Sequence, residues 1–310
     1  MEHHRSHPMF LPSLLIRDLG NLFKQESALD ESPLLLRDGQ VEGRFGDLYL
    51  STVFKRIRSA AQPGVVNGYQ AGLRLYAERE SPHFALDDFA NAQHTSALIN
   101  LDRLCRTIHL LNFLGLPDND ARLFLPVNPN YVIAVKKNHG AYFEDVLARC
   151  ERSPEQVVVS VSLGLWDGRA AAAVARGLEN YRARGYRIAL QSERKPHPEN
   201  SELALLREIN PDYFITPHGF GAAPDRFDTT EALSRLRSTI SVARGLGAEV
   251  VVEGVASARQ ADLSLAAGAN WVQGEYYEAG QQRTGSARPA EPANDSGDID
   301  LGALLAVGFA

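Results

Sequence analysis

The polar residues best placed for chemistry stand at the ends of short, apolar, β-branched segments, which are typical of buried strands. These ends carry amides, hydroxyls, one arginine and a single acid. A two-metal hydrolase needs several carboxylates to hold its cations and neutralise their charge. One carboxylate among amides and hydroxyls makes a poor Mg²⁺ or Ca²⁺ cage. The residues are Gln70, Arg74, Asn128, Ser160, Ser162, Gln191, Ser192, Glu253 and Gln273.

The segments that must position these residues alternate between strand and helix periodicity. Strands are predicted at 48–54, 65–75, 122–128, 157–163, 187–192, 213–217, 249–255 and 271–274. Helices are predicted at 85–114, 138–150, 168–184, 201–209, 229–246 and 257–267. Asp167 and Ser257 are candidate N-caps, and Gly185, Gly247 and Gly268 stand where helices must end.

Eight strands are the number that closes an α/β barrel, whose functional groups gather at the carboxyl ends of the strands. The first connection is different, because residues 55–64 are too few for a helical crossover and Gln62-Pro63-Gly64 favours a turn. The first two strands should therefore form a hairpin. The predicted fold is α/β: a modified (β/α)8 TIM-type barrel with one antiparallel strand, plus an N-terminal helix.

The two ends of the chain differ from this central pattern. An amphipathic helix is predicted at 12–26, where helical spacing aligns Leu14, Leu15, Leu19, Leu22 and Phe23. Its apolar face either packs on the main domain, which is the default, or meets a partner. After residue 280 the chain is small, polar and Pro-rich, which is typical of a flexible tail. The predicted divisions are an N-terminal extension at 1–39, a barrel domain at 40–280 and a tail at 281–310.

The bulk composition excludes several classes of protein. The chain has 310 residues, 44% hydrophobic and 23% charged, which excludes a wholly disordered chain or a disulfide scaffold. Its net charge of −6 argues against general nucleic-acid binding but leaves room for a local basic patch. Cys105 and Cys150 have no CxxC spacing and are expected to be reduced core thiols. No membrane span or signal peptide is predicted, and the expected location is cytoplasmic.

The segment at 250–277, VVVEGVASARQADLSLAAGANWVQGEYY, resembles the closing part of EAL domains, which are barrels that hydrolyse cyclic di-GMP. The family pattern there is EGVE, a helix with a Gln, a Gly-rich turn and QG on the last strand. The resemblance covers about residues 45–280. The other segments that carry it are GYQAGLR at 68–74, PVNPNYV at 126–132, VVVSVSLGL at 157–165, GYRIALQSER at 185–194 and NPDYFIT at 210–216.

The resemblance implies an active site that has lost most of its metal ligands, so no catalytic residue and no metal site is expected. The first metal-binding Glu, the second Glu, the Asp-Asp pair and the Lys of the family fall on Gln70, Ser160, Gln191, Ser192 and Ile215. Four residues keep the family's residue type and are the candidate ligand-binding residues: Arg74, Asn128, Glu253 and Gln273.

These residues also have structural interpretations. Arg74 either binds a ligand phosphate or pairs with Glu253 across the barrel mouth. Asn128 and Gln273 can satisfy buried backbone groups without a ligand. The default for Trp166, Trp271 and His218 is packing in the core or at the rim.

The function that the resemblance implies is that of a non-catalytic, EAL-like bacterial regulatory protein in cyclic di-GMP-related signalling. It would act by binding a protein partner, with cyclic di-GMP as a candidate ligand held without metal or other cofactor. The alternative is an active metal-dependent phosphodiesterase that uses Mg²⁺ or Mn²⁺ and yields linear pGpG.

Overall fold

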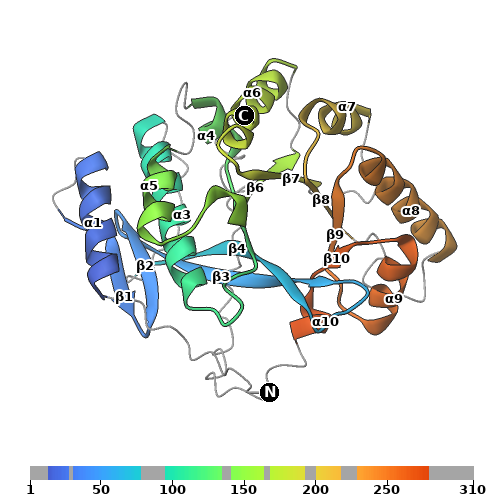
Figure 1. The fold of residues 1–310 in the computed structure, drawn as a ribbon, viewed down its shortest axis with the longest axis horizontal. Coiled ribbons are helices and arrows are strands. Elements are labelled where there is room, and N and C mark those ends of the chain that lie inside the picture. Colours follow the sequence, from blue (N-terminus) through green and yellow to red (C-terminus); the bar gives the residue numbers. More distant parts are fainter. Residues whose placement is uncertain are drawn as a thin grey trace.

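Eight strands of the described chain close into a barrel with helices on its outside (Figure 1). The computed structural model describes residues 13–27, 31–77, 95–134, 141–163, 168–192, 200–217 and 229–278. The barrel strands are β3 (Leu48–Ser59), β4 (Val66–Ala77), β5 (Arg122–Pro126), β6 (Val157–Leu163), β7 (Arg187–Ser192), β8 (Tyr213–Pro217), β9 (Glu249–Glu253) and β10 (Trp271–Val272).

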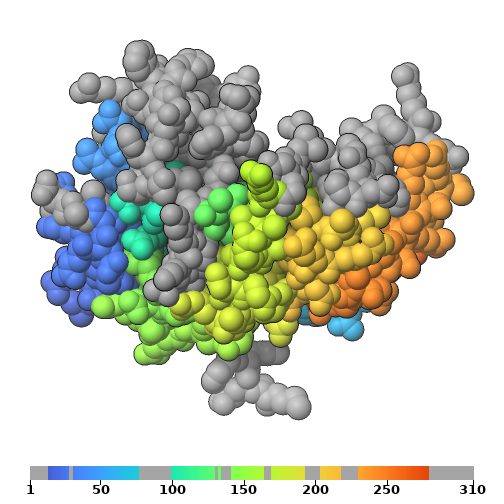
Figure 2. Space-filling model, turned by 90° about the horizontal axis from the view of Figure 1, so that it is seen from above, coloured from blue at the N-terminus to red at the C-terminus, as the bar shows by residue number. Residues whose placement is uncertain are grey.

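The helices lie outside the barrel, and the face shown in Figure 2 is covered by successive parts of the chain, from blue on one side to orange on the other. The helices are α1 (Ser13–Ser27), α3 (Thr95–Leu114), α4 (Pro129–Ala134), α5 (Ala141–Arg149), α6 (Gly168–Arg182), α7 (Asn200–Ile209), α8 (Thr229–Gly245), α9 (Ala258–Ala267) and α10 (Glu275–Glu278). A 3₁₀ turn, Pro154–Gln156, precedes β6.

The strand pairing confirms the predicted barrel with one antiparallel strand. Strands β4 to β10 pair in parallel with their neighbours in sequence, whereas β3 runs antiparallel to both β4 and β10 and closes the sheet. The predicted hairpin is the β3–β4 pair, in which Lys55 lies opposite Gln70. Strands β6, β7 and β8 have the predicted bounds, because each is a short apolar run that the barrel buries on both faces.

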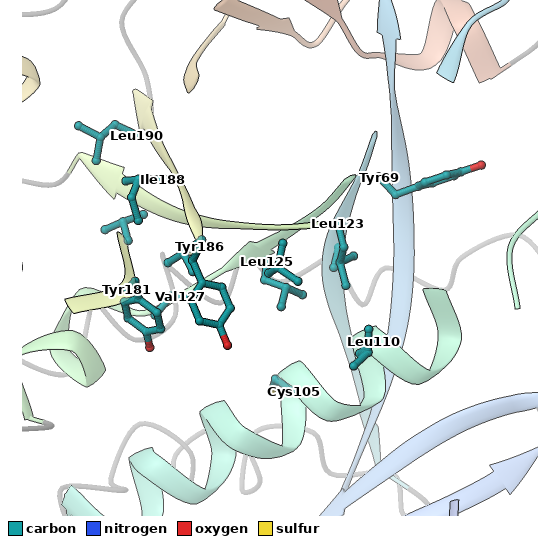
Figure 3. Packing of buried hydrophobic residues seen from close by; sticks show 14 of the residues in the cluster. Tyr69, Cys105, Leu110, Leu123, Leu125, Val127, Tyr181, Tyr186, Ile188 and Leu190 are labelled. Carbon is teal, nitrogen blue, oxygen red and sulfur yellow. The ribbon is translucent and has the colours of Figure 1, made fainter. Parts of the chain in front are cut away.

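The barrel is filled and covered by apolar side chains. Its interior is a cluster of Ile57, Phe124, Val158, Ala189, Tyr213, Ile215 and Val251, with Trp271 packed against it. The outer face of the strands packs against the helices, and Figure 3 shows side chains of β5 facing those of α3. Cys105 and Cys150 are buried free thiols, as predicted.

Local signals placed the helix ends correctly where the structure describes them. The Ser257 side chain accepts a hydrogen bond from the Gln260 N–H and caps α9, and Gly268 ends that helix in the left-handed conformation. Gly185 and Gly247 also have positive φ. Asp167, the other candidate cap, lies outside the described residues. No helix in the described ranges has the length and apolar character needed to cross a bilayer.

The N-terminal helix packs on its own chain. Ile16, Leu19 and Phe23 of α1 are buried, and the helix contacts α3, α5 and strand β1 (Leu34–Arg37). Leu14, which the predicted apolar face includes, is instead 65% exposed. The default interpretation of this helix, packing rather than partner binding, therefore describes most of its apolar face.

A second hairpin, which was not predicted from the sequence, extends the barrel sheet. Strand β1 pairs antiparallel with β2 (Gln40–Phe45), and β2 pairs with β3. The turn is Asp38-Gly39, and both residues have positive φ. Asp-Gly is a strong two-residue hairpin signal, so this turn could have been predicted from the sequence.

A buried polar network attaches this hairpin to the barrel. Asn112 of α3 donates to the Val41 carbonyl at 2.7 Å and accepts from the Val41 N–H at 2.8 Å. Its amide also donates to Thr52 Oγ1 at 3.2 Å. Thr52 Oγ1 in turn lies 2.8 Å from His109 Nδ1, at hydrogen-bond distance.

We predict that His109 makes stability fall as the solution is acidified. Burial lowers the pKa of His109 from its ordinary 6.5 to about 3. Between these values the unfolded chain binds a proton that the folded chain does not, so stability is lost as pH falls below 6.5. At pH 5 the loss relative to pH 7.5 should be about 2 kcal/mol. Urea unfolding of the native chain and of His109→Gln at both pH values measures it.

Another buried group with a shifted pKa acts in the opposite direction. Burial raises the pKa of Asp102 to about 6, with Arg106 beside it lowering the value, so Asp102 adds stability as pH falls. Because Asp102 is present in both proteins, the difference between their pH profiles isolates His109. Identical profiles in the native chain and His109→Gln would contradict the prediction.

Candidate functional site

Three glutamines and one glutamate form a closed hydrogen-bonded ring at the mouth of the barrel. Gln70 Nε2 donates to Gln191 Oε1 at 3.2 Å, and Gln191 Nε2 lies 3.2 Å from both carboxylate oxygens of Glu253. Gln273 Nε2 donates to Gln70 Oε1 at 2.6 Å and to Glu253 Oε2 at 3.2 Å. These four predicted site residues, from β4, β7, β9 and the end of β10, therefore meet. We call them the amide ring.

The carboxylate fixes the direction of every bond in the amide ring. An ionised Glu253 accepts hydrogen bonds and donates none, so Gln191 and Gln273 must turn their N–H groups toward it. Gln191 then presents its oxygen to Gln70, and the Gln70 oxygen is left for Gln273. One negative charge thus orients three neutral amides.

One buried oxygen of the amide ring has no hydrogen-bond partner among the described residues. It is Oε1 of Gln273, a residue that is only 2% exposed. A buried acceptor without a donor costs on the order of 1–3 kcal/mol.

The other predicted vestigial positions are buried on β6, β7 and β8. Ser160 of β6 is 3% exposed and Ser192 of β7 is 1% exposed. Ile215 of β8 packs in the apolar barrel interior. Asn128 follows β5, and its backbone carbonyl accepts the Val132 N–H in the first turn of α4.

Arg74, the fourth candidate ligand-binding residue, lies apart from the amide ring. It is exposed on β4, opposite Ser51 and four residues beyond Gln70. The two interpretations of Arg74, as a phosphate-binding residue or as a partner of Glu253, stay predictions. Trp271 packs at the barrel interior and its indole N–H donates to Glu249, whereas Trp166 and His218 lie outside the described residues.

Two neighbours of the amide ring were not predicted. Lys55 of β3 is exposed directly opposite Gln70, so its side chain lies on the same face of the hairpin. The alternation of side chains along the predicted hairpin could have identified Lys55 from the sequence. Gly274 has a φ of 154°, and a Cβ there would lie 2.1 Å from the Val255 carbonyl oxygen. Only glycine therefore fits beside Gln273.

The residues at the mouth do not fit a pair of divalent cations. The amide ring supplies one negative charge against the four positive charges of two such ions, and amide N–H groups point at the carboxylate that would bind them. Among the residues that the structure describes, no three His, Cys, Asp or Glu side chains are grouped so as to hold a metal. We therefore derive no chemical step through a metal.

Comparison with known proteins identifies the barrel. The EAL domain model matches residues 49–279. The chain belongs to the EAL domain family. The match begins at β3, so α1, β1 and β2 precede the EAL region. No curated protein matches the chain in sequence.

Three solved structures illustrate the similarity of the EAL barrel. The EAL enzyme Bd1971 in its cAMP-bound form is 16% identical with a TM-score of 0.58, over 74% of this chain and 62% of that one. A standalone EAL protein of Vibrio cholerae O395 bound to cyclic di-GMP is 18% identical with a TM-score of 0.56, over 73% and 89%.

The third is the Bacillus subtilis YkuI protein, which has an EAL domain and was solved with substrate cyclic di-GMP and calcium. It is 21% identical with a TM-score of 0.54, over 73% of this chain and 54% of that one. The chain thus spans less than two thirds of Bd1971 and YkuI. At these identities the similarity establishes a shared EAL barrel fold.

Proposed function

We propose that this EAL protein is a regulator in cyclic di-GMP-related signalling that does not hydrolyse the dinucleotide. It acts by binding a protein partner, and cyclic di-GMP is a candidate ligand that binds without metal. The observation that carries the proposal is the amide ring, in which three amides and one carboxylate satisfy one another where a two-metal site needs several carboxylates.

The charge at the mouth supports binding rather than turnover. In-line attack on a phosphodiester needs an activated water and positive charge around the phosphate. Ser160, Ser192 and Ile215 supply neither, and the amide ring is negative. Among the described residues, Lys55 and Arg74 of the β3–β4 hairpin carry positive charge on the face that holds Gln70, which suits a phosphate held directly by side chains.

The test is a hydrolysis assay combined with a calorimetric titration. Purified full-length protein should leave cyclic di-GMP intact in Mg²⁺ or Mn²⁺ when the products are resolved by chromatography. If the dinucleotide binds, its dissociation constant should be the same in chelator and in Mg²⁺. The matched control is Glu253→Gln, which removes the ring's charge at constant shape. Formation of pGpG that depends on Mg²⁺ and disappears in Glu253→Gln would establish the phosphodiesterase alternative instead.

A further inference from the structure

The four strands from β1 to β4 carry an excess of positive charge in a negatively charged protein. These strands contain six arginines or lysines and one acid, Glu42. The whole chain has a net charge of −6. The charge distribution is therefore uneven, and this sheet is where the positive charge gathers.

Strand register places four of these cations on one face. Side chains alternate between the two faces of a strand, and directly opposed residues share a face. Lys55 lies opposite Gln70 and Arg74 opposite Ser51, so both are on the face of the hairpin that carries Gln70. Arg44 lies opposite Tyr49 of the same face, and Arg37 lies over the Tyr49 ring at 4.3 Å. We call Arg37, Arg44, Lys55 and Arg74 the basic strip.

The basic strip extends from the amide ring beyond the barrel. Strand β4 pairs with β5 only at residues 68–70, and its later residues continue past the ends of the parallel strands. Figure 1 shows β3 and β4 as a long ribbon with β1 and β2 at one end and β10 at the other. From Lys55 to Tyr49 the ribbon spans roughly 20 Å, the length of about six extended residues.

The cations of the basic strip are exposed to solvent, whereas Glu42, the acid on these strands, is buried and hydrogen-bonded. Arg44, Lys55 and Arg74 are exposed, and the Arg37 side chain is 41% exposed. Glu42 is 9% exposed, accepts the Tyr76 hydroxyl hydrogen bond and lies 3.8 Å from Arg37. The solvent-exposed charged side chains of the strip are therefore positive, while the exposed acids of this sheet, Asp38 and Asp47, lie in the turns at its edge.

The aromatic side chains of this face are not available for base stacking. Tyr49 and Tyr76 stack on each other with centroids 5.3 Å apart, and Tyr49 is only 8% exposed beneath Arg37. Proteins that bind single-stranded nucleic acids stack the bases on accessible aromatic side chains. Carboxylates need no aromatic side chain for binding, and they pair well with arginine. The basic strip therefore favours carboxylates over single-stranded nucleic acid.

We propose that the basic strip docks an acidic, extended segment of a partner protein. This inference rests on the proposed function, for which it supplies the binding surface and the chemistry of the partner. A partner held there would lie beside the barrel mouth, so that a ligand at the amide ring and the docked segment would be neighbours.

The test uses a fluorescein-labelled deca-glutamate peptide and fluorescence anisotropy with the full-length protein. The native chain should bind the peptide, and affinity should fall with added salt. Arg44→Glu/Lys55→Glu should weaken binding at least tenfold. The matched control is Arg176→Glu/Arg207→Glu on the exposed surfaces of α6 and α7, which makes the same change in net charge, from −6 to −10. Its affinity should stay within about twofold of native. Circular dichroism melting checks that both variants fold.

Three results would overturn the docking surface. They are no binding by the native chain, equal loss in the two double variants, or tighter binding of a decathymidylate strand than of the peptide. The last would assign the strip to nucleic acid. The binding assay tests the basic strip, whereas the chromatographic assay for pGpG tests the proposed non-hydrolytic function. Failure of one proposal is therefore distinguishable from failure of the other.

Discussion

Replacement of Gly274 by alanine should destabilise the barrel by about 3 kcal/mol or more, because two effects add at this position. A Cβ there would lie 2.1 Å from the carbonyl oxygen and 2.3 Å from the nitrogen of Val255, and backbone cannot move aside as a flexible side chain can. Val255 N–H donates to the Gln273 carbonyl at 3.1 Å, and the Val255 carbonyl accepts the Tyr276 N–H at 3.1 Å. The methyl group would force both bonds apart.

Urea unfolding followed by circular dichroism measures this loss. The matched control is Gly245→Ala at the end of α8, where a Cβ would meet nothing within 4 Å. Alanine there should be neutral or stabilise by up to about 1 kcal/mol. If the two variants unfold at the same urea concentration, Gly274 is not required where the last strand leaves the barrel.

The barrel could be predicted because each of its strands is marked locally. Strands β6 to β8 are short apolar runs bounded by polar or glycine residues, and the barrel needs them buried on both faces. Strands β1 and β2 are not apolar runs of this kind. Residues Gln40–Phe45 alternate poorly, with Glu42 buried and Gly43 packed where a Cβ would meet Leu104. Their place depends on Asn112, a contact that is distant in sequence.

The site was predictable as a set of residues but not as a network. Sequence comparison placed Gln70, Gln191, Glu253 and Gln273 at strand ends, and closure of the barrel brings these ends together. The order of donors and acceptors follows from distances that no sequence pattern contains. The sequence likewise identifies Arg74 and Glu253 as charged residues at strand ends, but not the hydrogen bonds that Gln191 and Gln273 donate to Glu253.

The amide ring also explains how a barrel of this family can be stable without bound cations. Carboxylates at hydrogen-bond distance in a buried site repel one another, and either a metal or a proton must neutralise them. Amides at the positions of Gln70 and Gln191 remove two such charges and replace repulsion by donor–acceptor pairs. The unfavourable feature that remains in the ring is Gln273 Oε1, a buried acceptor that receives no hydrogen bond from the described residues.

Placing carboxylates at two positions of the amide ring should therefore make the stability of the fold depend on a bound metal ion. Gln70→Glu/Gln191→Glu keeps the side-chain shapes but puts carboxylates on side chains whose polar atoms now lie 3.2 Å apart, with Glu253 3.2 Å further along. In chelator at pH 7.5 this variant should lose about 3 kcal/mol or more, from repulsion and from the lost hydrogen bonds. Mn²⁺ should then stabilise it by about 2.7 kcal/mol when present at a hundredfold excess over its dissociation constant.

Thermal unfolding with and without Mn²⁺ measures this dependence in three proteins. The melting temperature of the native chain should not respond to Mn²⁺, because its one carboxylate is already held by Gln191 and Gln273. Gln70→Leu/Gln191→Leu breaks the same hydrogen bonds without adding charge, so it should be destabilised and equally unresponsive. A rise in the melting temperature confined to the glutamate variant would show that the two amides exclude the metal. An equal rise in the native chain would show that the amide ring already binds cations, and the non-hydrolytic assignment would then lose its physical basis.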